Sequence, residues 1–208
     1  MILLKKYIQD LLEDNSVFVS IGANDGVFVD EIFQSNLLNM NWTIYLIEPV
    51  YQTYQKLISN YNRYYPNNKF NFINIAINTY DGDGFLITNN NDDSFGLCSF
   101  FRAETTQSVK IPVICSTFKS FINKYQISNI DFLKIDTEGM DYEIVKQSLL
   151  SKIYPKIILL ENIGISNSSV TTFEDMIKQT QDNYVLIHDT PEFQYENDNL
   201  LLIRKEYV

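Results

Sequence analysis

The 208-residue chain is poor in the residues that mark several protein classes. It has seven glycines, five prolines, one histidine and two cysteines, Cys98 and Cys115. Low glycine and proline content excludes collagen-like and linker-rich chains. Two cysteines are too few for a disulfide framework and lack metal-ligand spacing, so we interpret them as free thiols. Free thiols are typical of a reducing compartment, and we expect a cytoplasmic location.

Positive charge and long apolar runs are also scarce. The chain has 16 Lys and Arg against 26 Asp and Glu, a net charge of −10. Nucleic-acid binders neutralise phosphates with Lys and Arg, so this balance argues against a nucleic-acid partner. No apolar run reaches the roughly 18 residues of a membrane span, so we expect no membrane partner. The spaced apolar positions of residues 1–14 predict an amphipathic helix and not a signal peptide.

The dominant pattern alternates short β-branched runs with apolar residues at helical spacing. We expect strands at 16–21, 43–48, 69–77, 130–136, 156–161, 184–188 and 199–204. We expect helices around 29–37, 51–61, 118–125, 137–151 and 170–180. The continuous apolar character of the first five strands indicates that both faces of the sheet are covered. The alternation predicts a doubly wound, mostly parallel α/β sheet, and the helix-free link between the last two strands predicts an antiparallel C-terminal strand.

Residues 79–113 interrupt this alternation. They contain a turn signal at 81–84, a short apolar run at 85–88 and an Asn-rich stretch at 89–96. We interpret them as a hairpin insertion after the third strand. Ser116 or Thr117 would then cap the following helix. The sequence shows no other domain boundary, so we expect residues 1–208 to form one domain, and nothing in it indicates an oligomeric state.

Polar groups follow four of the expected strands. These groups are Gly22–Gly26, Glu48, Asp136–Gly139 and Glu161–Asn162. In an open α/β sheet, ligands bind beyond the carboxyl ends of the strands. The alignment therefore predicts one site at one edge of the sheet.

The first two groups favour a nucleoside ligand. Gly22 and Gly26 would let the backbone approach a ligand closely, although they could instead only form the turn between strand and helix. Glu48 follows Gly26 by 22 residues, which suits a carboxylate that accepts both hydroxyls of an adenosine ribose. The chain has neither GxGxxG nor GxxxxGK[ST], so a nucleoside without a pyrophosphate is favoured.

Four segments carry a family resemblance: VFVSIGANDGVFVDEI, IYLIEPVYQTYQKL, NFINIAI and, above all, IDFLKIDTEGMDYEIVKQ. Together with LLENIG and the terminal NLLLIRK, they resemble the FkbM family of S-adenosylmethionine-dependent methyltransferases over about residues 15–205. The resemblance implies a Rossmann-like class I methyltransferase sheet. One departure is Ser20, where the family usually has an acid.

The resemblance also implies S-adenosylmethionine as the cofactor and assigns the residues that would contact it. The methionine and sulfonium portion would face Gly22, Asn24 and Gly26, the ribose would face Glu48, and adenine would face Ile75 and Ala76. Asp25, Glu48 and Asp136 would make the pocket acidic, which suits a sulfonium cation.

Transfer to a hydroxyl needs more than cofactor binding. The acceptor must be aligned, and its proton must be taken by a base or acidified by a metal. Asp136, Glu161 and Asn162 could hold Mg²⁺ through oxygen ligands, by analogy with sugar O-methyltransferases. Asp136, Glu161 and His188 are the candidate catalytic residues, His188 because histidine titrates near neutral pH.

The remaining acids and aromatics have less specific interpretations. Glu138 is a further candidate, or an acid favoured at a helix N-terminus. Asp141 and Glu143 are expected to be helix-surface charges. Phe95, together with residues 100–101, could stack on a sugar or aromatic acceptor.

The sequence therefore favours an O-methyltransferase that acts on a small molecule or glycan. A nicotinamide-dependent oxidoreductase on the same type of sheet is an alternative, disfavoured by the missing third glycine. A non-catalytic nucleoside-binding or interaction domain is another. Nucleic-acid methylation is weakened by the net charge of −10.

Overall fold

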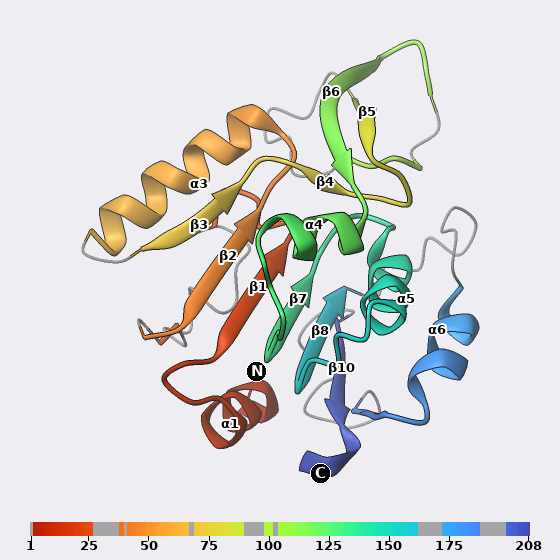
Figure 1. Cartoon of the computed structure of the whole chain (residues 1–208). Helices are drawn as coiled ribbons and strands as arrows, with labels where there is room; N and C mark the ends of the chain where they lie inside the picture. The colour runs from red at the N-terminus through yellow and green to blue at the C-terminus, as the bar shows by residue number, and fades with distance from the viewer. Residues whose placement is uncertain are drawn as a thin grey trace.

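The computed structural model describes residues 2–26, 38–39, 41–66, 69–89, 98–101, 104–161, 172–187 and 199–208. These residues form a seven-stranded sheet in the order β3-β2-β1-β7-β8-β10-β9 (Figure 1). The strands are β1 Val17–Ile21, β2 Thr43–Ile47, β3 Phe70–Ile73, β7 Phe132–Ile135, β8 Ile157–Glu161, β9 Tyr184–Leu186 and β10 Asn199–Arg204. The first five in this order run parallel, and β10 is antiparallel to both of its neighbours. The predicted fold class is confirmed.

Helices cover both faces of this sheet. They are α1 Ile2–Leu11, α3 Tyr51–Tyr64, α4 Phe118–Lys124, α5 Asp141–Leu150, α6 Phe173–Thr180 and the short 3₁₀ helix Lys205–Tyr207. Buried residues of α1 and α3 pack on one face, and those of α4, α5 and α6 pack on the other. The helix expected around 29–37 lies outside the described residues.

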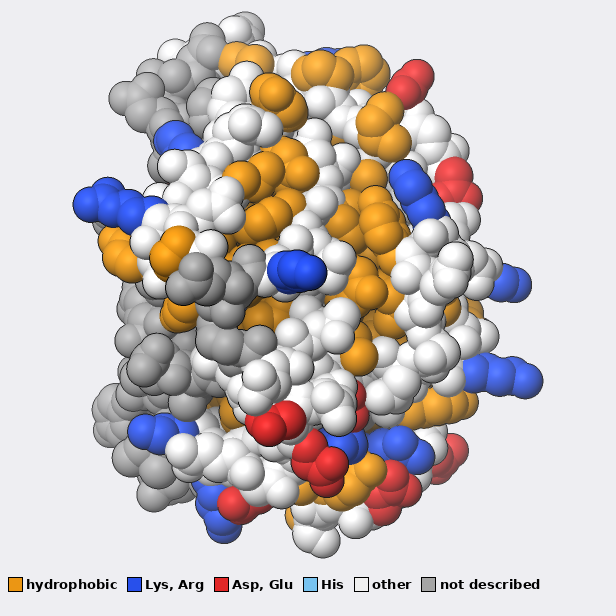
Figure 2. Space-filling view, turned by 60° about the vertical axis from the view of Figure 1, so that its left-hand side comes forward, with side chains coloured by type: hydrophobic (Ala, Val, Ile, Leu, Met, Phe, Trp, Pro, Cys, Tyr) orange, Lys and Arg blue, Asp and Glu red, His pale blue; other side chains and the backbone are white. Residues whose placement is uncertain are grey.

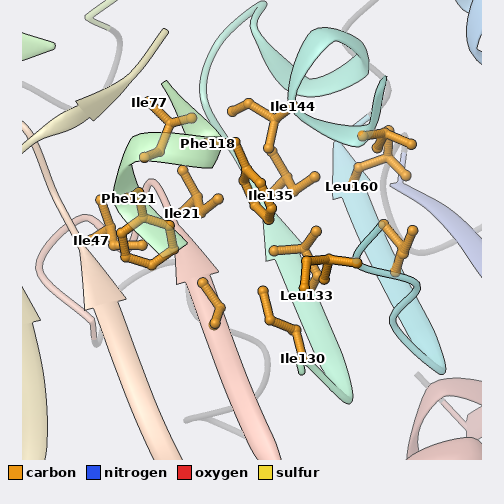
Figure 3. Packing of buried hydrophobic residues seen from close by; sticks show 14 of the residues in the cluster. Ile21, Ile47, Ile77, Phe118, Phe121, Ile130, Leu133, Ile135, Ile144 and Leu160 are labelled. Carbon is orange, nitrogen blue, oxygen red and sulfur yellow. The ribbon is translucent and has the colours of Figure 1, made fainter. Parts of the chain in front are cut away.

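The core between the sheet and helices α4, α5 and α6 shows why the strands are apolar along their whole length. Phe118 and Phe121 of α4 and Ile144 of α5 lie over the sheet residues Ile21 and Ile135 (Figure 3). All five side chains are buried to 1% exposure or less. Successive strand residues point to opposite faces, so a sheet covered on both sides buries every position.

The prediction of one strand over residues 69–77 is wrong in one respect. The structure divides it into β3 and a separate strand, β4 Ala76–Ile77, which belongs to a second sheet. Asn74 lies at the break, and its amide nitrogen donates to the carbonyl oxygens of Glu48 and Pro49, both at 2.8 Å. These side-chain bonds fix the chain where it leaves the main sheet.

The insertion is a hairpin, as predicted, but it is longer than expected. Strands β5 Gly82–Asn89 and β6 Ser108–Ser116 pair antiparallel, and β6 also pairs with β4 to complete a three-stranded sheet. The expected turn at 81–84 therefore belongs mostly to β5. Residues 90–97, most of the predicted loop, lie outside the described residues. Thr117 caps α4 by accepting from the backbone N–H of Ser120.

The aromatic residues are divided between the core and the surface. Phe18 and Phe132 stack in the core with ring centroids 4.7 Å apart, whereas Tyr51 and Phe85 are more than half exposed. Figure 2 shows hydrophobic side chains at the surface between polar and basic ones on one face of the molecule. Within the described part of the chain, no helix is long and apolar enough to cross a membrane.

Candidate functional site

A pocket lies at the carboxyl ends of the parallel strands, beneath the insertion. It encloses about 620 Å³ of empty space, part of it open to solvent. Its lining from the main sheet and the loops that follow its strands is Ile21, Gly22, Asn24, Ile47–Val50, Ile75, Asp136–Glu138 and Met140. Ala76 and Ile77 of β4 add to the lining from the second sheet. Leu86, Cys98 and Phe100 close it from the insertion. It spans the ends of β1 and β7, where ligands bind in open α/β sheets.

Gly22 holds the two central strand ends close together. Its φ is +79°, and a Cβ atom at this position would lie 1.7 Å from the carbonyl oxygen of Asp136. Only glycine fits both the backbone conformation and this contact. The wall between the ends of β1 and β7 is therefore bare backbone.

Glu48 connects the ends of β1 and β2 in the pocket wall. One carboxylate oxygen accepts from the backbone N–H of Asn24 at 3.0 Å, and the other accepts from that of Val50 at 2.8 Å. Burial raises the pKa of Glu48 to about 7, although the two backbone N–H groups oppose the shift and the charge of Asp136 adds to it. The carboxylate is thus fixed in position and sensitive to pH near neutrality.

The loop after β7 is held by Asp141, which sequence analysis placed on the helix surface. The structure corrects this: Asp141 and Glu143 are 4% and 6% exposed. The carboxylate of Asp141 accepts from the hydroxyl of Thr137 at 2.8 Å and from the backbone N–H of Gly139 at 3.2 Å. These bonds support a turn in which Glu138 has a φ of +56°. The four-residue spacing from Thr137 to Asp141 was the signal that could have revealed this contact.

Lys134 is a second residue that sequence analysis did not single out. Its side chain is 8% exposed, and its ammonium lies 3.4 Å from a carboxylate oxygen of Asp136. Lysine is rarely buried without a partner, so a lysine inside an apolar strand was the signal available in the sequence.

The insertion contacts the loop after β7 directly. The hydroxyl of Ser99 donates to the carbonyl oxygen of Glu138 at 2.6 Å and accepts from the backbone N–H of Phe101 at 3.1 Å. Ser99 also pairs with Ile87 of β5 through two backbone hydrogen bonds. The hairpin and the pocket rim are therefore one connected unit.

Comparison with known families gives this geometry its context. The family model of the methyltransferase FkbM domain matches residues 20–185. The chain belongs to the FkbM methyltransferase family. The resemblance carried by its strand-end motifs is thereby confirmed. No curated protein matches this FkbM-family chain at a significant level.

Solved structures of distant proteins are similar to this FkbM-family domain. A candidate rRNA methylase from Clostridium thermocellum is 10% identical, with 96% of this chain and 91% of that chain covered and a TM-score of 0.50. The magnesium protoporphyrin IX methyltransferase from Synechocystis PCC 6803, with bound S-adenosylmethionine, is 9% identical, with 98% and 77% covered and a TM-score of 0.49. At such identities the likeness concerns the fold alone.

Six of the eight residues predicted to contact the cofactor line the pocket of this FkbM-family domain. They are Gly22, Asn24, Glu48, Ile75, Ala76 and Asp136. Asp25 and Gly26 are not part of the lining. A Cβ atom on Gly26 would meet Tyr61 and Leu57, so this glycine lets the loop pack against α3. Cofactor contacts by all eight residues stay a prediction.

The candidate catalytic and metal-binding residues are only partly described. Ile135 pairs with Leu160, so Asp136 and Glu161 follow at the same edge on neighbouring strands. Asn162 and His188 lie outside the described residues, and so does the side chain of Glu161. Among the residues that are described, no group of three or more His, Cys, Asp or Glu is placed to hold a metal ion. The Mg²⁺ site therefore stays a prediction.

Proposed function

We propose that this FkbM-family domain binds S-adenosylmethionine in the pocket between β1 and β7 and transfers its methyl group to a hydroxyl of a small molecule or glycan. The observation that carries the proposal is the position of Glu48, fixed by two backbone hydrogen bonds at the end of β2 in the pocket wall. The proposed cytoplasmic location rests on the scarcity of cysteine alone.

The lining fits the chemistry of this cofactor. Ile47, Val50, Ile75 and Ala76 supply apolar surface suited to a purine. The bare backbone at Gly22 leaves room for a group that lies across the ends of β1 and β7. Glu48 and Asp136 bring carboxylates to the same pocket, and carboxylates attract a sulfonium cation.

Each residue has a distinct proposed role toward the cofactor. The Glu48 carboxylate accepts hydrogen bonds from the ribose hydroxyls. Each of its oxygens can do so because it retains a lone pair after accepting a hydrogen bond from one backbone N–H. Asn24 and Gly22 lie along the methionine portion, and Asp136 faces the cationic end. When bound, S-adenosylmethionine supplies an electrophilic methyl group and is left as the neutral thioether S-adenosylhomocysteine.

The acceptor side is proposed from chemistry and from the sheet register. A hydroxyl must give up its proton as it is methylated, and a carboxylate within hydrogen-bond reach can take it. Asp136 at the end of β7 and Glu161 at the end of β8 follow paired residues, so both are candidates for this base. His188 and a Mg²⁺ ion held by Asp136, Glu161 and Asn162 remain alternatives for the same step.

Cofactor binding is the first test. We expect S-adenosylmethionine and S-adenosylhomocysteine, each added alone, to raise the unfolding temperature and to bind in calorimetric titration. Glu48→Ala should weaken the affinity for each of the two ligands by at least about tenfold, because both contain the adenosine ribose. Asp83→Ala on β5, an exposed residue outside the pocket, is the matched control and should leave both affinities unchanged.

Other outcomes would contradict the proposal. Stabilisation by NAD and not by the two adenosyl compounds would favour an oxidoreductase. Unchanged affinity in Glu48→Ala would remove the ribose assignment. Once cofactor binding is established, a screen of glycans and metabolites with methyl-labelled cofactor identifies the acceptor. Loss of that labelling in EDTA, restored by Mg²⁺, would establish the metal requirement.

A further inference from the structure

Lys134 is buried beneath the pocket and does not line it. It lies on β7 between Leu133 and Ile135, with a side chain only 8% exposed. Its register partner on β1 is Ser20, which is fully buried and uncharged. Asp136, 3.4 Å away, supplies the countercharge. A buried ammonium is costly unless it is paired, so this contact couples Lys134 to the pocket carboxylate.

Asp136 in turn belongs to a group of three acids around the pocket. Glu48 is 6% exposed and Asp141 is 4% exposed. Burial raises the pKa of both carboxyls, and the negative charge of Asp136 adds to the shift. Within the described part of the chain, Lys134 forms an ion pair with one of these acids, Asp136. Its single positive charge therefore offsets part of a concentrated negative potential.

We propose that Lys134 is a positioning residue that holds Asp136 and sets the charge of the pocket, and thereby its preference for a sulfonium over a thioether ligand. The inference rests on the proposed function and goes one step further. S-adenosylmethionine carries one more positive charge than S-adenosylhomocysteine, and their other groups are the same. The difference between their affinities is therefore a direct measure of the potential in the pocket.

The sign of the effect follows from Coulomb's law. The ammonium of Lys134 repels the sulfonium cation and leaves the neutral thioether nearly unaffected. Replacing it with an uncharged side chain makes the pocket more negative and increases the preference for S-adenosylmethionine. Neutralising Asp136 makes the pocket less negative and decreases that preference. A purely structural role for Lys134 would shift both affinities together.

The experiment measures both affinities by calorimetry at pH 8 in wild type and four variants. For Lys134→Met we expect the ratio of the two affinities to move roughly three- to tenfold toward S-adenosylmethionine, the size expected for one partly screened charge. Asp136→Asn should move it in the opposite direction. Lys134→Arg keeps the charge and should keep the wild-type ratio.

Lys156→Met is the matched control. Lys156 also forms a partly buried ion pair, with Asp131 at 3.2 Å. Asp131 precedes β7 and Asp136 follows it, so the two ion pairs lie about 16 Å apart along the strand. Lys156→Met should lower stability and leave the affinity ratio unchanged.

The possible failures are distinguishable. Wild-type protein that binds neither ligand would overturn the proposed function and this inference with it. Wild-type protein that binds both, with the same ratio in Lys134→Met, would overturn the inference alone. If Lys134→Met does not fold, an unchanged ratio in Asp136→Asn overturns it equally, because the coupling acts through that carboxylate.

Discussion

The backbone N–H of Asn24 donates to the carboxylate of Glu48 at 3.0 Å, and this bond joins the loop after β1 to the end of β2. Two motifs that lie 24 residues apart in the chain thereby form one wall of one pocket. The carboxylate cannot move without disturbing that loop. Its protonation state consequently affects the part of the site proposed to hold the cofactor.

The first prediction concerns the pH dependence of cofactor affinity. Burial raises the pKa of Glu48 to about 7, and the proposed contacts to ribose hydroxyls and a cation favour the ionised form. Binding must therefore displace a proton below that pH. We expect S-adenosylmethionine to bind about tenfold more weakly at pH 6 than at pH 8. Calorimetry in two buffers of different ionisation enthalpy should detect the released proton. A similar slope in Glu48→Gln would contradict the assignment.

The second prediction concerns stability and pH. The pKa of Glu48 is raised to about 7 and that of Asp141 to about 6, both mainly by burial. Between these values and the unfolded ones near 4, the folded chain holds more protons than the unfolded chain, so the free energy of unfolding falls as pH rises. Chemical denaturation at pH 5.5 and pH 8 should show the lower stability at pH 8. Asp141→Asn should reduce the difference. A free energy that rises with pH over this window would refute the account.

The third prediction concerns the close approach at Gly22. In Gly22→Ala the new Cβ atom would overlap the carbonyl oxygen of Asp136 at 1.7 Å and impose strain at a φ of +79°. We expect a loss of more than about 2 kcal/mol in the free energy of unfolding, measured by denaturant titration. Gly82→Ala is the control, because Gly82 also has positive φ but nothing lies within 4 Å of the place that its new Cβ atom would take. Equal losses in the two variants would mean that the contact with Asp136 has no effect.

The fourth prediction concerns the contact between the insertion and the pocket rim. Ser99→Ala removes the hydroxyl that joins Glu138 and Phe101 and leaves two backbone groups without their partner. We expect a loss of about 1–3 kcal/mol and a several-fold weaker affinity for S-adenosylhomocysteine, since Phe100 lines the pocket beside this contact. Ser116→Ala, at the other end of the hairpin, removes a hydroxyl contact with Asp81 and should leave the affinity unchanged. Wild-type affinity in Ser99→Ala would separate the insertion from the site.

The sequence predicted the main sheet because its periodicity is local. Apolar runs such as 16–21 and 130–136 are strands wherever both faces are covered, and the spacing on α3 is helical in any context. The strand ends of β1, β2 and β7 then had to meet at one edge, since parallel strands share a direction. The positions of Gly22, Glu48 and Asp136 around one pocket follow from that rule.

Tertiary structure decided what depends on contacts between distant segments. The break at Asn74 depends on carbonyl groups after β2, and the packing role of Gly26 depends on Leu57 and Tyr61 of α3. No local pattern reveals either contact.

The burial and pairing of charged residues also depend on contacts between distant segments, so the sequence did not reveal them. Scarce Lys and Arg and a net charge of −10 were evident from composition, but burial and pairing are properties of the fold. Asp141 has the sequence pattern of a surface acid and is buried under the loop that it holds. Lys134 occurs in an apolar strand, and its charge is balanced by Asp136 at the pocket. The sequence by itself determined the strands of the main sheet and the ends of β1, β2 and β7. The folded structure decided which charges face each other, because electrostatic pairing depends on distance in space and not on separation along the chain.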